Sequence, residues 1–224
     1  DRAPGNLALF SAQREVAEGA YLRGPCLRLR HCGTEEQVCF RQEILLLGEH
    51  NLLNVLAATA VCAVAGAATA AIREVVTSFR GVEHRLELVR ELKGARFYND
   101  SIATTPERTV AALNSFEQPI VLIAGGKSKH LPLELLAERI VSKVRTLILT
   151  GELGQEIEEA VRNTPGGQAV PIVRCSSMEK AVDKAREVAR AGDVVLLSPG
   201  GASFDAFRDF EERGQHYKAL VNSL

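Results

Sequence analysis

Residues 7 to 47 alternate apolar and polar positions in short runs, a pattern that is typical of β-strands. Polar or glycine-containing turns such as GTEEQ separate the runs. The runs are LALFSAQ, AYLRG, CLRLRHC and QVCFRQEILLL. The pattern therefore predicts β structure over this segment.

A long stretch rich in Ala, Leu and Val comes next, GEHNLLNVLAATAVCAVAGAATAAI. Its length and composition predict a helix that is buried on most faces. Gly66 interrupts the stretch, so we expect two helices rather than one. The following segment, IREVVTSFRG, has helical spacing and a stop signal at Gly81.

The pattern changes after Gly81. HRLELVREL and ARFYND predict a hairpin around the turn at Lys93-Gly94, and TTPERTVAALNSF predicts a helix with Thr105 as N-cap and Pro106 in its first turn. Apolar strands then alternate with amphipathic helices. These segments are PIVLIAGG, LPLELLAERIVSK, TLILTG, GQEIEEAVRN, VPIVRC, SMEKAVDKAREVARAG, DVVLLSPGG and SFDAFRDFEERGQHYKALVNSL, the last expected to open its helix at the Ser-Phe-Asp-x-Phe cluster.

This alternation predicts an α/β fold with a mostly parallel sheet that helices cover on both faces, joined by right-handed connections. We place a domain boundary near Gly81. It divides the chain into residues 1–81 and 82–224, and no disordered linker is visible between them.

Composition removes several functional classes. The formal net charge of −1 gives no bulk electrostatic case for binding nucleic acid or an anionic membrane. No apolar run reaches the roughly 18 residues of a membrane span, and no secretory signal is visible, so we expect a cytoplasmic protein. Five scattered cysteines without a CxxC favour reduced thiols. Cys26, His31, Cys32 and Cys39 lack the spacing of a structural zinc site, so we expect no metal there.

The chain begins at Asp1 rather than at a methionine, and its only methionine is Met178. We therefore expect the sequence to be part of a longer protein.

Three strand ends carry loops of small or polar residues: IAGGKSK (123–129), LTGE (149–152) and LSPGGAS (197–203). Ligands of open α/β sheets bind outside the carboxyl ends of the strands, where glycines allow close approach and helix starts attract anions. A tight strand-to-helix turn explains any one loop alone. Three such loops, together with Asn99, Asp100 and Lys129, favour a binding site at one edge of the sheet.

Two nucleotide motifs are absent. GGKS is no phosphate loop, because its glycines are adjacent and the GxxxxGK[ST] spacing is missing. GGAS lacks the later glycine of a dinucleotide fingerprint, so a Rossmann oxidoreductase has little support.

Three further sets of polar residues have two interpretations each. Asn51 and Asn54 share one helical face, either as a cap with a buried hydrogen bond or as contacts to a nucleotide. Arg85 is either an ordinary surface arginine or a forked phosphate contact near the boundary. The loop YNDSIATTP offers turn and cap chemistry, or contacts to a carboxylate or phosphate; its polar members include Asp100, Ser101, Thr104 and Thr105.

Five segments in this order resemble the Mur ligase family: GEHNLLN, GVEHRLE, YNDSIATTPE, IAGGKSK and LSPGGASFDAFRDFEERG. The resemblance runs from about residue 7 to the C-terminus. NDS-x-AT and SP-x-x-AS-x-D-x-F, which includes Asp205, are similar to the members that add D-glutamate. Members that add alanine, a diamino acid or D-Ala-D-Ala usually carry other residues there.

The resemblance implies a three-domain, ATP-dependent enzyme. Residues 1–81 would be the C-terminal part of the central ATP-binding domain, and residues 82–224 a complete, Rossmann-like C-terminal domain that binds the incoming amino acid. The UDP-binding domain, the phosphate loop and the segment with the family's carbamylated lysine would lie upstream. A chain without them should be inactive alone.

The implied reaction belongs to cytoplasmic peptidoglycan synthesis. ATP, with Mg²⁺, phosphorylates the carboxylate of UDP-N-acetylmuramoyl-L-alanine, and the amine of D-glutamate attacks the acyl phosphate to form an amide. The protein positions the reactants and offsets developing charge. We expect a monomer whose Mg²⁺ is held mainly by the upstream region.

The family's binding positions carry over to nine residues, with no catalytic residue or metal ligand among them. The ATP-binding positions match Asn51, Asn54, Arg85 and Asp100, and the D-glutamate positions match Thr104, Lys129, Ser203, Phe204 and Phe210. Two positions depart from the family pattern. Ile102 replaces the frequent lysine of NDSKAT, so that charge is lost or supplied elsewhere. Thr105-Pro106 replaces the frequent Asn after AT and should only change the helix start.

Two alternatives remain open. One is another amino-acid-adding relative, such as a folylpolyglutamate synthase. The other is a non-catalytic ligand-binding module that retains the fold.

Overall fold

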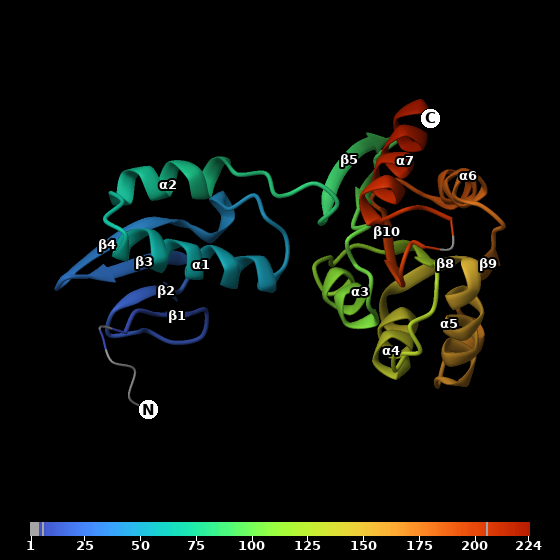
Figure 1. Cartoon of the computed structure of the whole chain (residues 1–224), viewed down its shortest axis with the longest axis horizontal. Helices are drawn as coiled ribbons and strands as arrows, with labels where there is room; N and C mark the ends of the chain where they lie inside the picture. The colour runs from blue at the N-terminus through green and yellow to red at the C-terminus, as the bar shows by residue number, and fades with distance from the viewer. Residues whose placement is uncertain (1–4, 6, 205) are drawn as a thin grey trace. The chain divides into compact units, whose positions relative to one another are not determined.

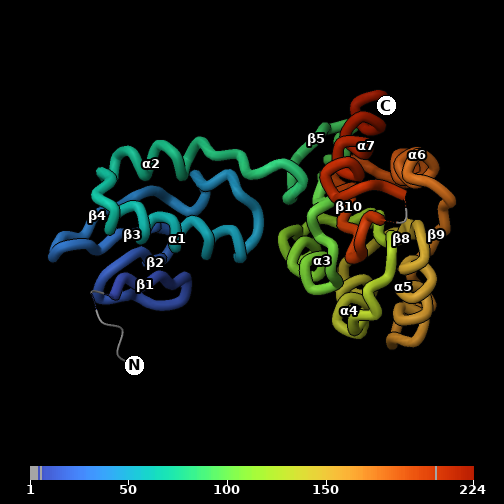
Figure 2. Tube along the Cα trace, viewed as in Figure 1, coloured from blue at the N-terminus to red at the C-terminus, as the bar shows by residue number. Residues whose placement is uncertain are grey.

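The computed structural model describes residues 5, 7–204 and 206–224, and the chain divides into two compact units, Asp1–Gly81 and Val82–Leu224. Figure 1 shows their elements in order, and Figure 2 shows the path of the chain. Within the described residues, no helix has both the length and the apolar character needed to cross a membrane.

The first unit is a four-stranded sheet with two helices. The strand order is β1-β2-β3-β4, with β1 and β2 parallel and the other pairs antiparallel. Its core joins Leu27 and Leu29 of β3 to Leu56 of α1 and Ile72 of α2. The elements are β1 (Leu9–Ser11), β2 (Gly19–Arg23), β3 (Cys26–His31), β4 (Thr34–Phe40), the 3-10 turn η1 (Arg41–Glu43), α1 (Glu49–Val64) and α2 (Thr69–Ser78).

Two details of this unit correct the sequence prediction. The segment GTEEQ is mostly strand, because the turn is made by Cys32 and Gly33 at φ 51° and 78°, and β4 begins at Thr34. The run EILLL is no strand, because Phe40 pairs with Cys26, the first residue of β3, and the ladder has no partner beyond it. The division of the helical stretch at Gly66 is confirmed, since α1 ends at Val64 and Gly66 has φ 88°.

The second unit is a six-stranded sheet in the order β5-β6-β10-β7-β8-β9. Only β5 is antiparallel to its neighbour, so the mostly parallel sheet is confirmed. The strands are β5 (Glu87–Leu92), β6 (Ala95–Asn99), β7 (Ile120–Gly125), β8 (Val144–Thr150), β9 (Ile172–Arg174) and β10 (Val194–Gly200). The helices are α3 (Pro106–Leu113), α4 (Glu134–Lys143), α5 (Gly151–Asn163), α6 (Met178–Val188) and α7 (Phe210–Ser223), with a 3-10 turn η2 (Gly167–Ala169).

Helices cover both faces of this sheet (Figure 1). The helices α3, α4 and α5 pack side by side on one face, and α6 and α7 pack together on the other. Every residue of the central strands β7 and β10 is buried, which explains their continuous apolar sequences. On the second face, Val121, Ile123 and Val195 pack against Val182 of α6 and Tyr217 of α7.

Two helix starts are worth comparing with the sequence. Thr105 is the N-cap of α3 and Pro106 its first residue, as expected, although the Thr105 side chain makes no capping bond. The last helix begins later than predicted, at Phe210 rather than at the Ser-Phe-Asp-x-Phe cluster. Asp209 caps it, because its side chain accepts a 2.7 Å hydrogen bond from the backbone N–H of Glu212.

Candidate functional site

The loops that follow the parallel strands of the second unit gather at one edge of the sheet. The loops after β7 and β10 are joined there by a bridge in which Lys127 and Ala202 exchange backbone hydrogen bonds of 2.9 and 3.1 Å. Gly126 (φ 106°) allows this approach, because a Cβ at that position would lie 2.4 Å from the carbonyl oxygen of Ala202. The bridge fixes the positions of two loops that carry predicted ligand-binding residues.

Asp100 follows β6 and lies at the centre of a buried polar network. Its Oδ2 accepts a 2.8 Å bond from the Ser198 hydroxyl of β10, and its Oδ1 accepts a 3.2 Å bond from the backbone N–H of Leu86. Burial raises the pKa of the Asp100 carboxyl to about 7, although the bonds from Ser198 and Leu86 act in the opposite direction. Both carboxylate oxygens therefore hold strand ends together, and a contact with ATP stays a prediction.

Arg213 of α7 is a second organising residue and is only 3% exposed. Its guanidinium donates from Nε to the Ser101 hydroxyl at 3.0 Å, from Nη2 to the Ser101 carbonyl at 2.9 Å and from Nη1 to the Gly201 carbonyl at 3.2 Å. The Ser101 hydroxyl in turn donates to the Phe210 carbonyl at 2.7 Å. One buried cation thus joins the loop after β6, the loop after β10 and the start of α7.

His84 fills the space beside this network. Its Nδ1 lies 2.9 Å from the amide nitrogen of Asn99, and its ring meets Phe210 edge to face at 6.2 Å. Gly214 lies against the imidazole so closely that a Cβ there would be 2.2 Å from Nδ1. A glycine inside α7 is therefore required by packing, despite its low helix propensity.

The structure brings some of the predicted D-glutamate residues together. The exposed Lys129 donates from Nζ to the Thr104 carbonyl at 2.9 Å. Ser203 is buried in the loop that the Lys127–Ala202 bridge holds next to the Lys129 loop. Phe204 is 69% exposed, and Phe210, the first residue of α7, is partly buried.

The predicted ATP residues fall in both units. Arg85 is exposed in the second unit. In the first unit, Asn51 is buried and donates to the Leu47 carbonyl at 2.8 Å, while the exposed Asn54 donates to Asn51 Oδ1 at 3.4 Å. The alternative that Asn51 caps the helix is wrong, because α1 starts at Glu49 with Gly48 as its N-cap. Contacts of these residues with ATP stay predictions.

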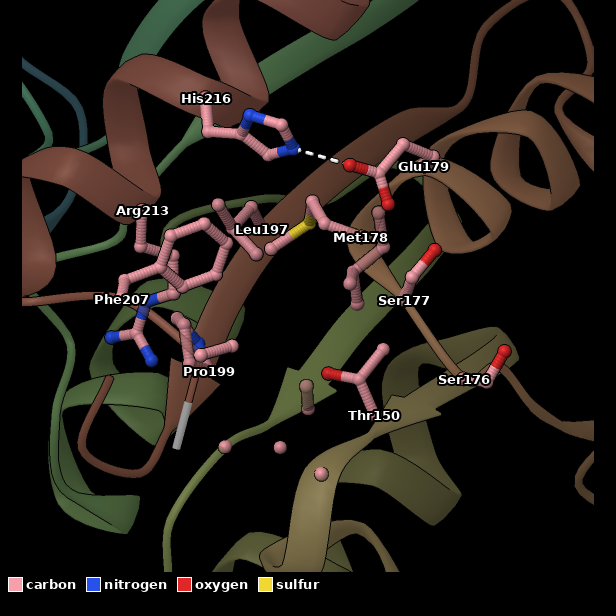
Figure 3. Close-up of a pocket in the computed structure, with 16 residues that line it drawn as sticks. Thr150, Ser176, Ser177, Met178, Glu179, Leu197, Pro199, Phe207, Arg213 and His216 are labelled. Atoms are coloured by element: carbon pink, nitrogen blue, oxygen red, sulfur yellow. Dashed lines mark hydrogen bonds and ion pairs between the residues drawn. The ribbon is translucent and has the colours of Figure 1, made fainter. Parts of the chain in front are cut away.

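The second unit also contains two cavities, and the first is lined by residues of all three loops expected from the sequence: Gly125 and Gly126, Thr150 and Gly151, and Leu197 and Pro199. A cavity of about 430 Å³ lies where β7, β8 and β10 end, and Figure 3 shows Thr150, Ser177 and the ion pair of Glu179 with His216 around it. The hydroxyl of Ser177, followed by a backbone N–H and His216, lowers the pKa of Glu179 to about 2. None of the nine predicted binding residues lines this cavity. A more open hollow of about 630 Å³ has Phe210, His84 and Ile102 in its wall.

Thr104, Lys129 and Ser203 thus lie in loops on one edge and Phe210 lies at the start of α7, yet neither of these two cavities is lined by all four. Asp205, which belongs to the recognition motif, lies outside the described residues.

A cationic side chain lies next to Ile102, the residue that replaces the lysine frequent in the family. The guanidinium of Arg108, an exposed residue of α3, donates from Nη1 to the Ile102 carbonyl at 3.0 Å. A positive charge is therefore present beside the position where lysine is frequent in the family.

Sequence reasoning missed Arg213, Gly214 and His84. A signal was available for the first two, because an arginine followed by a glycine inside a helix is unusual without a packing reason. Nothing local indicated that His84 would be buried.

Comparison with known proteins identifies the family of this chain. Residues 84–201 match the family described as Mur ligase, glutamate ligase domain. A protein of Symbiobacterium thermophilum named UDP-N-acetylmuramoylalanine–D-glutamate ligase is 51% identical over 224 residues, which cover 99% of this chain and 49% of the relative. A protein of the same name from Acetivibrio thermocellus is 44% identical over 226 residues. The chain spans about half the length of these relatives.

Solved structures with the same fold include the UDP-N-acetylmuramate-alanine ligase MurC of Thermotoga maritima, with a TM-score of 0.63 and 15% identity over 96% of this chain and 47% of that one. A Mycobacterium tuberculosis folylpolyglutamate synthase gives a TM-score of 0.59 and 16% identity over 87% of this chain and 45% of that one. At these identities the likeness shows the fold alone.

Proposed function

We propose that this chain, which belongs to the Mur ligase family, is the amino-acid-binding half of a UDP-N-acetylmuramoylalanine–D-glutamate ligase (MurD). The single observation that carries the proposal is the 51% identity to a relative of that name over 99% of the chain. The whole enzyme would join D-glutamate to UDP-N-acetylmuramoyl-L-alanine through an acyl phosphate, in cytoplasmic peptidoglycan synthesis, and would act as a monomer.

Each unit has its own part in this proposal. Residues 82–224 would bind D-glutamate at the carboxyl edge of their sheet. Residues 1–81 would form the C-terminal part of the ATP-binding domain. No phosphate loop occurs in the 224 residues, so this chain alone would turn over nothing.

The polar and aromatic residues at the sheet edge suit a small amino acid with two carboxylates. Lys129 has three N–H donors, and the Thr104 carbonyl takes one of them, so the ammonium can also bind a carboxylate. A hydroxyl such as that of Ser203 can donate to a carboxylate oxygen, and Phe210 can pack on the carbon chain. These residues would hold D-glutamate so that its amine meets the acyl phosphate.

Two exposed residues of this chain can contribute part of the ATP site. The amide of Asn54 is exposed and offers both a donor and an acceptor, which suits the edge of an adenine. Arg85 is exposed and can bind a phosphate with its forked donors.

Mg²⁺ does not fit the residues at hand. Mg²⁺ prefers oxygen ligands, and among the described residues the one group with metal-binding geometry contains a thiol and an imidazole: Glu18, His31 and Cys32. We infer that the ion would be held by parts of the enzyme outside these 224 residues.

A hybrid enzyme tests the proposal. The corresponding C-terminal half of the Symbiobacterium thermophilum relative is replaced by this chain, and phosphate release from ATP is measured with UDP-N-acetylmuramoyl-L-alanine. We expect release that depends on D-glutamate and is lost with L-glutamate, D-Ala-D-Ala or a diamino acid.

Two outcomes would contradict it. Release that depends on L-glutamate would favour the folylpolyglutamate synthase alternative. A folded hybrid that binds D-glutamate without releasing phosphate would favour the non-catalytic binding module. The unmodified Symbiobacterium thermophilum relative, assayed in the same way, is the control for assay conditions.

A further inference from the structure

A polar cluster in the first unit lies at the hairpin between β3 and β4. It consists of Glu18, His31 and Cys32, whose ligand atoms all lie within 4.8 Å of one another. The sequence singled out His31 and Cys32 but not Glu18, because Glu18 precedes β2 and reaches the hairpin only through the pairing of β2 with β3.

Hydrogen bonds place the Glu18 carboxylate next to the His31 imidazole and the Cys32 backbone. Glu18 Oε1 lies 2.7 Å from His31 Nδ1, and it also accepts a 3.0 Å bond from the backbone N–H of Cys32. That backbone bond, together with the bond from His31, holds the pKa of the Glu18 carboxyl below its usual range. An ionised carboxylate can only accept, so Nδ1 must carry the proton and Nε2 of a neutral imidazole is left as an acceptor.

The thiol lies on the accepting side of the ring. Cys32 Sγ is 3.4 Å from His31 Nε2, within hydrogen-bond distance for sulfur, and Cys32 is exposed. Carboxylate, imidazole and thiol therefore form a line in which the imidazole can take the thiol proton and the carboxylate can stabilise the resulting imidazolium. This is the arrangement by which a base and its orienting group activate a nucleophile.

The surroundings favour a reactive thiol over a metal site. The Glu18 oxygen already accepts two N–H groups, which leaves Nε2 and Sγ as direct ligands, fewer than the four of structural zinc sites. A cavity of about 420 Å³ is lined by His31 and Glu36, with Leu29 and Ala63. It offers space beside His31, whose imidazole contacts the thiol, although Cys32 itself does not line it. Arg28 and Arg30 pair with Glu35 on the other face of β3.

We propose that Cys32 is a modification site that exchanges with low-molecular-weight disulfides, with His31 as proton acceptor and Glu18 as the residue that orients the imidazole. The Cys32 sulfur attacks one sulfur of the disulfide R–S–S–R, the new S–S bond forms as the old one breaks, and the departing thiolate takes the proton from the imidazolium. Cys32 ends as a mixed disulfide, and one equivalent of R–SH leaves.

The chain contains its own control for this test. Cys62 on α1 is also a free, exposed cysteine. The 224-residue chain is incubated with oxidised glutathione at pH 7, free thiols are trapped with N-ethylmaleimide, and the mixed disulfide at each cysteine is measured by peptide mass spectrometry. We expect Cys32 to react at least about tenfold faster than Cys62, as for thiols activated by a nearby base. Rates within about twofold of each other would overturn the proposal.

Two variants separate activation from simple exposure. His31→Gln should lower the Cys32 rate to roughly that of Cys62 and leave Cys62 unchanged, and Glu18→Gln should give an intermediate rate because it keeps an acceptor without the charge. Iodoacetamide, a small uncharged probe, should give the same ranking. If both variants retain the full Cys32 rate, exposure alone accounts for it and the proposal is wrong.

The pH dependence gives an independent readout. Glu18 and His31 contact Cys32, Glu36 lines the same cavity as His31, and the buried Cys39 and Arg73 of α2 are further titratable groups packed against this sheet. The ratio of the Cys32 and Cys62 rates should be largest near pH 7 and approach one near pH 10, where an ordinary thiol is also ionised. A ratio that does not change with pH would contradict the role of His31.

Discussion

Two sets of polar residues share the carboxyl edge of the six-stranded sheet, and they differ in burial. Asp100, Ser198 and Arg213 are buried, and their hydrogen bonds end on other parts of the protein. Lys129 and Arg85 are exposed. The difference suggests a division of roles, in which the buried set holds the loops in place and the exposed set meets the ligand.

The largest expected effect comes from removing the buried cation. Arg213→Met deletes three hydrogen bonds and leaves the buried carbonyls of Ser101 and Gly201 without that donor, so we expect a loss of about 3 to 5 kcal/mol in the free energy of unfolding of residues 82–224. Native-state hydrogen exchange of the β6 and β10 amides measures it for this unit alone. The control is Arg208→Met, since Arg208 is exposed and pairs with Glu212 at the surface. If both substitutions lower the free energy of unfolding equally, the buried and exposed sets do not differ in their structural role.

Asp100 gives a smaller effect that depends on pH. Its folded pKa of about 7 lies above its usual value near 4, so the folded state keeps a proton that the unfolded state releases. This contribution is complete at low pH and is lost as the pH rises toward and through 7. Between pH 5 and 8 it should remove about 2 to 3 kcal/mol of stability, and Asp100→Asn should abolish that part of the slope. The same hydrogen-exchange measurement at both pH values checks it. An identical slope in the variant would show that Asp100 is ionised throughout.

Lys129 should behave in the opposite way. Lys129→Ala should leave the free energy of unfolding unchanged within about 0.5 kcal/mol, because the side chain is exposed, yet weaken D-glutamate binding about tenfold by removing the cation. Calorimetric titration of the hybrid enzyme with D-glutamate measures the affinity. Lys127→Ala, at a neighbouring exposed lysine, is the matched control and should bind normally. If Lys129→Ala lowers the free energy of unfolding, Lys129 helps to hold the loops in place, as the buried set does.

The smallest effect concerns Arg108. If its guanidinium supplies the charge that Ile102 lacks, Arg108→Gln should lower D-glutamate-dependent phosphate release by the hybrid roughly two- to fivefold, as expected for one exposed charge. The double variant Ile102→Lys with Arg108→Gln should restore the rate. A rate that does not respond to either change would mean that this position carries no needed charge.

The sequence predicted the sheet well, because its signals are local. Continuous apolar runs indicated β7 and β10, and glycine-containing loops at the strand ends indicated the binding edge. The buried set could not be predicted from the sequence, because its contacts join residues that are far apart along the chain. Arg213 meets Ser101 across 112 residues, and Glu18 meets His31 through a strand pairing, so neither contact leaves a periodic pattern. The late start of α7 was missed because the cap at Asp209 competes with an equally suitable Ser203.

Binding of D-glutamate at the sheet edge is tested most directly by a nuclear magnetic resonance titration. The 224-residue chain is titrated with D-glutamate and, separately, with L-glutamate. We predict that D-glutamate shifts the backbone amides of Thr104, Lys129 and Ser203 and that L-glutamate shifts them far less. Shifts confined to the residues around the cavity of about 430 Å³, such as Thr150 and His216, or equal shifts with both enantiomers, would contradict the account.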